Sequence, residues 1–173
     1  NLRAWQQSVG YVPQDIFLTD ASLSENIALG VPHKDIDQTR VEEAARIAQI
    51  DQFITSDLPE GYKTTIGERG VRLSGGQRQR IGIARALYHN ANLIMFDEAT
   101  SALDNHTEAE VLAAIETLPG DKTVVMIAHR LSTVKQCDRI IVMEAGAIVG
   151  IGSWDSLIET NAAFQKIAQK GAV

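Results

Sequence analysis

The segment at residues 92–98 has four consecutive apolar residues, Leu-Ile-Met-Phe, and ends in the carboxylates Asp97 and Glu98. A short continuous apolar run is typical of a strand that is buried on both faces in a parallel sheet. A second apolar run, residues 123–129, follows a segment of helical periodicity at residues 107–118. Because strand and helix alternate here, the sequence predicts an α/β fold with helices on the faces of a parallel sheet.

Polar side chains are expected at the carboxyl ends of these strands, where open parallel sheets bind their ligands. Gln14 follows a predicted strand at residues 8–12, Asp97 and Glu98 end the second strand, and His129 ends the third. Gln14 or His129 alone would more often be structural. Two adjacent acids point in different directions, so one can hold Mg²⁺ while the other faces a water molecule. The pair therefore indicates phosphoryl transfer to water.

A predicted helix begins at Ser74 and has Gly75 and Gly76 in its first turn. Glycine costs about 1 kcal/mol relative to alanine inside a helix, so close approach of another group to the backbone is the usual reason for it. Ser74 suits an N-cap, and a helix N-terminus without side-chain bulk suits a phosphate. The alternative is a plain serine-capped helix, which is the commoner outcome for an isolated Ser-Gly-Gly.

The residues after Gly76 alternate basic and apolar side chains in a helical pattern. Ile81, Ala84 and Leu87 recur at three-residue steps and form one apolar stripe for a core. The arginines are predicted to lie largely outside this stripe: Arg78, Arg80 and Arg85.

Residues 20–90 are predicted to be nearly all helical, which indicates a helical subdomain inserted before the sheet resumes. A capping box of Ser22 and Glu25 marks one of its helices. The further predicted elements are a helix at 36–48, a long connection at 56–72, two strands around a glycine turn at 138–152, and two short helices after residue 152.

The composition fits one acidic, globular domain with a subdomain. The chain has 173 residues, 45% of them hydrophobic, a net charge of −6 and a pI near 5.2, with no basic run, which argues against a nucleic-acid partner. The single Cys137 cannot form an internal disulfide, which fits the cytosol. No apolar stretch approaches the roughly 18 residues of a membrane helix, so any link to a membrane is expected to run through a partner.

At six places the chain resembles, in order, the nucleotide-binding domain of an ATP-binding cassette (ABC) transporter. The matching stretches are YVPQD (11–15) for the Q-loop, TIGERG (65–70) for an exporter-type loop, LSGGQ (73–77) for the signature, LIMFDE (93–98) for Walker B, SALD (101–104) for the D-loop and AHR (128–130) for the histidine switch. The resemblance implies a partial P-loop NTPase-like (RecA-like) sheet. Residues 1–19 and 91–173 would form the ATPase core, and residues 20–90 the helical signature subdomain.

The resemblance also implies a role for each matching residue. Asp97 would hold Mg²⁺, Glu98 would polarise the attacking water, and His129 would contact the γ-phosphate of ATP. Gln14 would touch the metal or the water and link to the membrane partner. The remaining residues would bind ATP of the opposite subunit in a head-to-tail dimer (Ser74, Gly75, Gly76 and Gln77), lie across the dimer interface (Ser101 and Asp104) and face the loops between transmembrane helices (Gly67, Glu68 and Arg69).

One family motif has no match. The phosphate-binding stretch G-x-x-x-x-G-K-[ST] does not occur in the sequence, so the N-terminal part of the domain is expected to be missing. We expect the chain alone to bind ATP at best in the millimolar range, about −4 kcal/mol, and not to hydrolyse it. Unpaired sheet edges would then give marginal stability or self-association.

The sequence thus predicts the C-terminal portion of the ATPase subunit of an ABC exporter at the cytoplasmic face of the cell membrane. Its partners would be a second nucleotide-binding domain and a transmembrane domain. An alternative is a non-catalytic dimerisation or regulatory fragment that offers LSGGQ to an intact partner. A soluble relative that acts on DNA or ribosomes is disfavoured by the acidic charge and the exporter-type loop.

Overall fold

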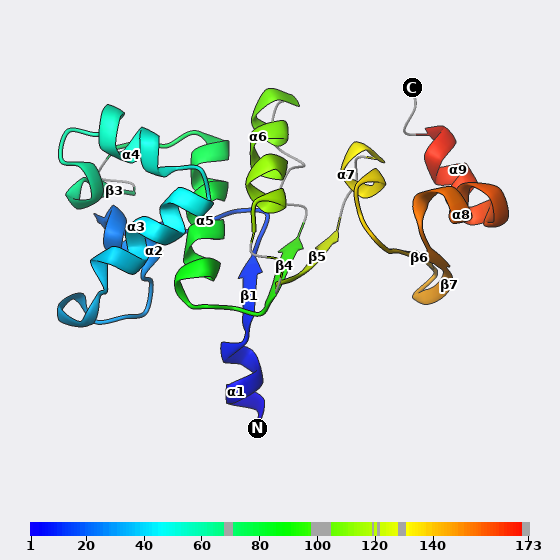
Figure 1. Ribbon diagram of the computed structural model, residues 1–173, viewed down its shortest axis with the longest axis horizontal. Coiled ribbons are helices and arrows are strands. Elements are labelled where there is room, and N and C mark those ends of the chain that lie inside the picture. The colour runs from blue at the N-terminus through cyan, green and yellow to red at the C-terminus, as the bar shows by residue number, and fades with distance from the viewer. Residues whose placement is uncertain (68–70, 98–104, 119, 121, 128–130, 171–173) are drawn as a thin grey trace. The chain divides into compact units, whose positions relative to one another are not determined.

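The computed structural model describes residues 1–67, 71–97, 105–118, 120, 122–127 and 131–170 (Figure 1). The chain divides into two compact units, residues 1–127 and residues 128–173. It combines helices with a parallel sheet, which confirms the predicted α/β class. In the described ranges, no helix is both long enough and apolar enough to cross a membrane.

A three-stranded parallel sheet forms the centre of the first unit. Its strands are β1 (Val9–Val12), β4 (Leu93–Asp97) and β5 (Thr123–Ile127), in the order β1-β4-β5. All three were predicted to within two residues. Asp97 pairs with Ile127 and ends the central strand, so the strand ends that the sequence analysis singled out lie at one edge of the sheet.

Helices cover one face of this sheet. Gly10 faces α5 (Gly75–Tyr88), where a side chain would be excluded because a Cβ at Gly10 would lie 2.6 Å from the Cβ of Ala86. The helix α6 (Asn105–Glu116) joins the same core through Val111. Buried sheet residues on this face are Gly10, Val12, Ile94 and Phe96.

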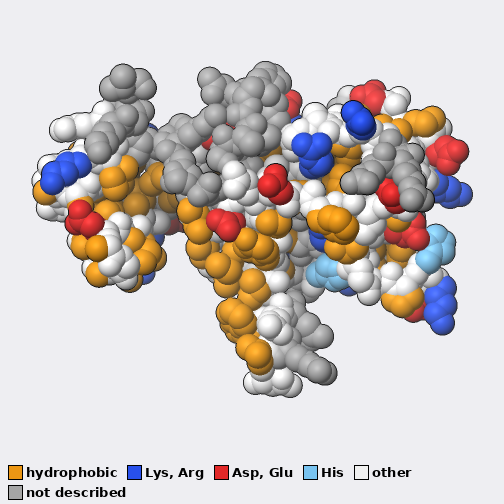
Figure 2. Space-filling model, turned by 180° about the vertical axis from the view of Figure 1, so that it is seen from behind, with side chains coloured by type: hydrophobic (Ala, Val, Ile, Leu, Met, Phe, Trp, Pro, Cys, Tyr) orange, Lys and Arg blue, Asp and Glu red, His pale blue; other side chains and the backbone are white. Residues whose placement is uncertain are grey.

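The opposite face carries exposed apolar side chains. Tyr11 is 58% exposed, Val125 45% and Ile127 55%, and the three alternate with buried residues in β1 and with half-buried residues in β5. Figure 2, which views the molecule from behind, shows hydrophobic side chains gathered over its middle. The described elements therefore cover one of the two faces of the sheet.

Two helices of the first unit, α2 (Leu23–Ile27) and α3 (Gln38–Ile47), pack against α5, whereas α1 (Leu2–Gln7) precedes β1 and contacts that strand (Figure 1). The helices α2 and α3 begin as the sequence suggests: Ser22 and Glu25 form the predicted capping box, and Asp37 accepts a hydrogen bond from the Arg40 backbone N–H. The other described elements of this unit are β2 (Ala21–Ser22), η1 (His33–Asp35), α4 (Asp51–Asp57), η2 (Gly61–Lys63) and β3 (Thr65–Ile66). The strands β2 and β3 pair antiparallel.

Two helices of this unit were not predicted. The helix α4 buries only Ile54, so it lacks a repeating apolar stripe, and its last residues occupy the start of the predicted connection. The helix α1 has exposed apolar side chains at Leu2 and Trp5. Neither segment has the periodicity on which helix prediction depends.

Two arginines of α5, Arg80 and Arg85, bind partners within the first unit. Arg85 donates from Nε to the Asn26 carbonyl (2.9 Å) and from its terminal nitrogen to the Phe17 carbonyl (3.1 Å), and burial lowers the pKa of its guanidinium. Arg80 forms an ion pair with Glu110 of α6. Both side chains are half-buried, and partners within the unit bind their guanidinium groups. Arg78 is exposed as predicted.

The second unit is a hairpin with helices. Its predicted glycine turn is confirmed: Ala145 and Gly146 both have positive φ, 50° and 81°, as a two-residue type I′ hairpin turn requires. The two predicted C-terminal helices are also present, whereas α7 was not predicted. The elements are α7 (Leu131–Lys135), β6 (Ile140–Glu144), β7 (Ala147–Gly152), α8 (Trp154–Thr160) and α9 (Ala162–Lys170).

Candidate functional site

Asp97 occupies the carboxyl end of the central strand and is half-buried. The hydroxyl of Tyr11, on the neighbouring strand β1, donates a hydrogen bond of 2.7 Å to Asp97 Oδ2. This hydrogen bond, with smaller effects of desolvation and of the carboxylate charge, raises the pKa of the Tyr11 phenol. One oxygen of the predicted metal ligand is thus held by a side chain of the next strand.

Gln14 lies two residues beyond the end of β1 and is exposed. Its backbone carbonyl accepts a hydrogen bond of 2.7 Å from Nε2 of Gln79, a buried residue of α5. A longer contact of 3.4 Å joins the same nitrogen to the Pro13 carbonyl. The backbone of the predicted Q-loop is therefore attached to the helix that begins with the signature residues.

The signature turn, Ser74 to Gln77, has a defined geometry. Ser74 is the N-cap of α5, as predicted, and its Oγ accepts from the Gln77 N–H at 3.2 Å. In return, Gln77 Oε1 accepts from the Ser74 N–H at 2.8 Å. Sequence reasoning missed this capping box, although the spacing of serine and glutamine three residues apart is its signal. Gly76 is buried and Ser74 is exposed.

Gly67 directly follows β3 and is the described one of the three loop residues, Gly67, Glu68 and Arg69, that were predicted to face the membrane partner. Its φ of 112° lies in the region that favours glycine, and a Cβ would lie 2.9 Å from the Thr19 carbonyl and closer still to Asp20 Oδ1. The β2–β3 pairing brings these segments together. Only glycine fits here without displacing the chain at residues 19–20.

Several predicted site residues lie outside the described residues, and their roles stay predictions. They are Glu98, Ser101, Asp104 and His129, together with Glu68 and Arg69 of the exporter-type loop. Among the residues that the structure does describe, no three His, Cys, Asp or Glu side chains are close enough to form a metal site. The described candidate ligands are the carboxylate of Asp97 and the amide of Gln14.

One structural residue near this site was missed by sequence reasoning. Asn26 is fully buried; its Oδ1 accepts from the Thr19 N–H at 2.9 Å, and its Nδ2 donates to the carbonyls of Thr19 and Ser22, both at 3.1 Å. It fixes the chain between the Q-loop and α2. An asparagine inside a short helix, where its propensity is poor, was the available signal.

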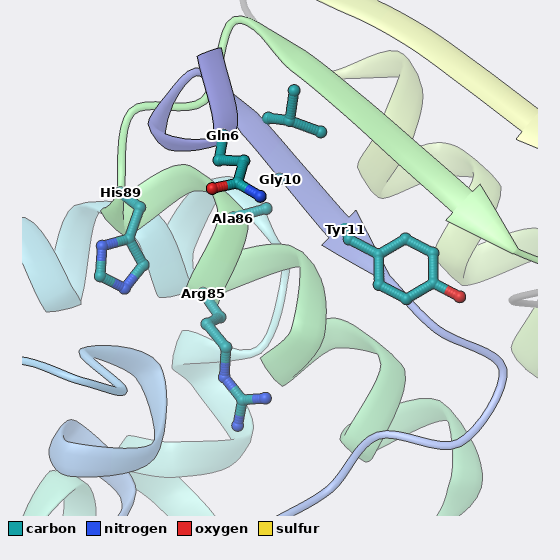
Figure 3. Close-up of a pocket in the computed structure, with 7 residues that line it drawn as sticks. Gln6, Gly10, Tyr11, Arg85, Ala86 and His89 are labelled. Carbon is teal, nitrogen blue, oxygen red and sulfur yellow. The ribbon is translucent and has the colours of Figure 1, made fainter. Parts of the chain in front are cut away.

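A pocket of about 590 Å³ lies between α1, β1 and α5 and coincides with none of the predicted sites. Figure 3 shows its Arg85 and Tyr11 side chains pointing in different directions. Its basic groups already have partners, since Arg85 binds two carbonyls and His89 Nε2 lies 3.0 Å from the Leu29 carbonyl. These side chains brace residues 17–29. The lining residues are Gln6, Val9, Gly10, Tyr11, Arg85, Ala86 and His89.

Comparison with known proteins identifies the family. The family model described as ABC transporter matches residues 1–101. The chain belongs to the ABC transporter family. This confirms the resemblance to the ABC transporter family that was drawn from the sequence stretches.

Curated ABC relatives are similar over almost all of the chain. The putative multidrug export ATP-binding/permease protein YgaD of Bacillus subtilis is 45% identical over 165 residues, which cover 95% of this chain and 28% of YgaD. An ATP-dependent lipid A-core flippase of Cupriavidus metallidurans is 44% identical, with 92% and 27% coverage. The leukotoxin translocation ATP-binding protein LktB of a Pasteurella haemolytica-like species is 49% identical, with 90% and 22% coverage.

A solved structure agrees with this assignment. The chain superposes on a bacterial Atm1-family ABC exporter with ATP bound, with a TM-score of 0.84 and 38% identity, over 97% of this chain and 29% of that exporter. The chain therefore spans between about a fifth and a third of the length of these ABC transporters.

Proposed function

We propose that the chain is the C-terminal portion of the ATPase subunit of an ABC exporter, in which ATP binding and hydrolysis drive transport across a membrane. The similar proteins are named as export, flippase and translocation proteins, and the similar structure is an exporter with ATP bound. The observation that carries the proposal is Asp97, a half-buried carboxylate at the carboxyl end of the central parallel strand, one oxygen of which Tyr11 holds.

The described residues include oxygen donors that would hold Mg²⁺ together with phosphate oxygens. Mg²⁺ prefers hard oxygen donors and is usually held by one or two carboxylates together with phosphates, without a complete cage of protein ligands. Asp97 and the amide oxygen of Gln14 are donors of this kind, and they follow neighbouring strands. Bound there, Mg²⁺ would neutralise charge that develops on the phosphate oxygens. Because Tyr11 binds Oδ2, Oδ1 of Asp97 would be the oxygen that holds the cation.

The chain's other proposed roles follow the family motifs. Glu98 accepts a proton from the attacking water, and His129 contacts the γ-phosphate. The turn from Ser74 to Gln77 meets the ATP of the opposite subunit with the N-terminus of α5, where the helix dipole favours an anion. Ser101 and Asp104 lie at the interface of the two subunits.

The proposed partners are a second nucleotide-binding domain in a head-to-tail dimer and the transmembrane domain of the exporter, with the ATPase part at the cytoplasmic face of the membrane. Gly67 and its loop would contact the membrane partner. The acidic net charge of −6 supports a role without nucleic acid.

A second candidate function is a non-catalytic module that offers LSGGQ to an intact partner. The reciprocal hydrogen bonds of Ser74 and Gln77 favour it, because the signature turn is shaped by residues of this chain alone. A partner domain that has the phosphate-binding motif but a broken signature tests this candidate. Recovery of its ATP hydrolysis when the chain is added would support the second function.

Calorimetric titration with ATP and Mg²⁺ tests the main proposal. The titration compares two proteins that both carry Glu98→Gln to block hydrolysis: the 173-residue chain, and a form extended upstream by a segment with G-x-x-x-x-G-K-[ST]. We expect only the extended form to bind tightly and to dimerise. Tight binding by the 173 residues alone would show that the phosphates are held elsewhere, and absence of binding by the extended form would overturn the ATPase proposal.

A further inference from the structure

Gln79 is a buried polar residue in the second turn of α5, only 5% exposed. Its Nε2 donates to the Gln14 carbonyl at 2.7 Å and approaches the Pro13 carbonyl at 3.4 Å. Its Oε1 is buried and has no hydrogen-bond partner among the residues that the structure describes. The side chain thus combines a donor bound to the Q-loop backbone with an unpartnered acceptor.

This hydrogen bond joins two segments that are 65 residues apart in the sequence. The first is the Q-loop segment, residues 13–16, and the second is the first turns of α5, which begin at the signature residues. One turn further along α5, a Cβ at Gly82 would lie 2.5 Å from Ile16 Cδ1, so the helix and the segment are also in tight apolar contact. Gln79 supplies a directional contact that packing alone does not give.

Stability alone does not account for a glutamine at this position. A buried acceptor without a partner is unfavourable by at least as much as one neutral hydrogen bond is favourable, so the two polar ends of the Gln79 side chain offset each other in stability. Methionine has a similar length and would bury no unpartnered oxygen. Buried unsatisfied groups in native proteins call for an explanation beyond packing, and a functional role is one such explanation.

We propose that Gln79 is a positioning residue that couples the signature turn of α5 to the Q-loop backbone at Gln14. A displacement of either segment is transmitted to the other through the Nε2–carbonyl hydrogen bond. The unpartnered Oε1 lets the carboxamide take a second arrangement when a donor moves into reach. The coupling itself does not depend on the proposed function. Only its role in ATP binding and hydrolysis rests on that function, which assigns both segments to the nucleotide site.

Hydrogen exchange on the nucleotide-free chain tests the coupling, with Gln79→Met as the variant. We expect exchange of the amides of residues 14–17 and 75–78 to rise about fivefold to tenfold, the range that loss of one hydrogen bond gives. The midpoint of denaturant unfolding should stay unchanged or rise, because the variant also removes the unpartnered acceptor. A residue with a merely structural role would lower the midpoint and raise exchange throughout the first unit.

Gln165→Met is the matched control. Gln165 of α9 donates from Nε2 to two successive carbonyls, Ile158 at 2.7 Å and Glu159 at 3.4 Å, which reproduces the geometry of Gln79 in the other unit. This variant should leave exchange of residues 14–17 and 75–78 unchanged.

A double-mutant cycle separates coupling from local loosening. Ser74→Ala removes the N-cap of α5 and should speed exchange at residues 14–17 when Gln79 is present. In the Gln79→Met background, Ser74→Ala should have no further effect on residues 14–17. Equal effects of Ser74→Ala in the two backgrounds would overturn the proposal.

The wild-type chain gives an answer even if Gln79→Met does not fold. The carboxamide protons of Gln79 should exchange slowly because Nε2 is buried and bound, and exchange as fast as that of exposed glutamines would overturn the proposal. These measurements need no nucleotide, so a negative result contradicts the coupling and not the proposed ATPase function. A negative calorimetric result contradicts the ATPase function and not the coupling.

Discussion

The hydroxyl of Tyr11 donates a hydrogen bond of 2.7 Å to Asp97 Oδ2 and so joins the carboxyl ends of β1 and β4. A charge-assisted hydrogen bond of this kind is stronger than one between neutral groups. It orients the carboxylate that we propose for Mg²⁺, and it connects two neighbouring parallel strands, β1 and β4.

Asp97→Asn should lower the pKa of the Tyr11 phenol toward its usual value. The carboxylate accepts the phenol's hydrogen bond and opposes its ionisation, so the pKa in the folded chain is raised. The hydrogen bond therefore contributes stability below the phenol pKa of the unfolded chain, and this is lost as pH rises through the folded pKa. Ultraviolet titration of the tyrosines measures the change.

Tyr62→Phe is the control for that titration. Tyr62 also donates to a carboxylate, Asp51 Oδ1 at 2.6 Å, and burial and Asp51 raise its pKa. Removing Tyr62 should leave the effect of Asp97→Asn intact. If Asp97→Asn does not change the titration of Tyr11, the two groups are not bonded in solution.

Glu25→Gln should reduce the loss of stability in acid. Ser22, through its hydroxyl and then its N–H, lowers the pKa of Glu25, and His33 adds to this. The carboxylate thus contributes stability above its unfolded pKa, and the contribution is lost as pH falls through the lower, folded pKa. Urea unfolding midpoints across the acid range measure this. Glu159→Gln, at an exposed position of α8, should leave the acid range unchanged.

Gly10→Ala should destabilise the first unit by about 1–3 kcal/mol, as overpacking does. The new methyl would lie 2.6 Å from the Cβ of Ala86 and 3.0 Å from that of Ala91, and neither neighbour has a rotamer into which it could move. Denaturant unfolding measures the loss. Ala86→Gly should recover part of it in the double variant, and additive losses would show that the contact is absent.

Asn26→Leu should destabilise the chain by about 2–4 kcal/mol, because it leaves the backbone groups of the half-buried Thr19 and Ser22 without their partner, a fully buried amide. Thermal unfolding with exchange mapping locates the effect. Asn161→Leu is the control in the second unit, where the half-buried Asn161 side chain binds the Val149 carbonyl and the Phe164 N–H. Equal effects of the two variants would contradict the importance of burial at Asn26.

Local signals predicted much of the fold. The strand at 92–98, the Ser74 cap and the Ser22–Glu25 capping box each depend on residues within a few positions of one another, so the sequence contains the whole signal. The helix α4 was missed because one buried residue, Ile54, makes no periodic pattern.

The contacts of the candidate site were less predictable. Asp97 at a strand end follows from the apolar run before it, but its bond to Tyr11 depends on which strands are neighbours and in which register. Gln79 and Arg85 bind backbone carbonyls 65 and 59 residues away, and a carbonyl has no residue identity that a sequence pattern could reveal.

Arg85 binds the carbonyls of Phe17 and Asn26 with one planar guanidinium. Because the donors of the guanidinium have a fixed geometry, they set the distance between the two carbonyl oxygens. A lysine at this position would present a single point charge and could not do so. The base of the segment between these two carbonyls consequently has a fixed width. An insertion within residues 18–25 should therefore leave the two carbonyls in place and displace β2 and the start of α2 instead.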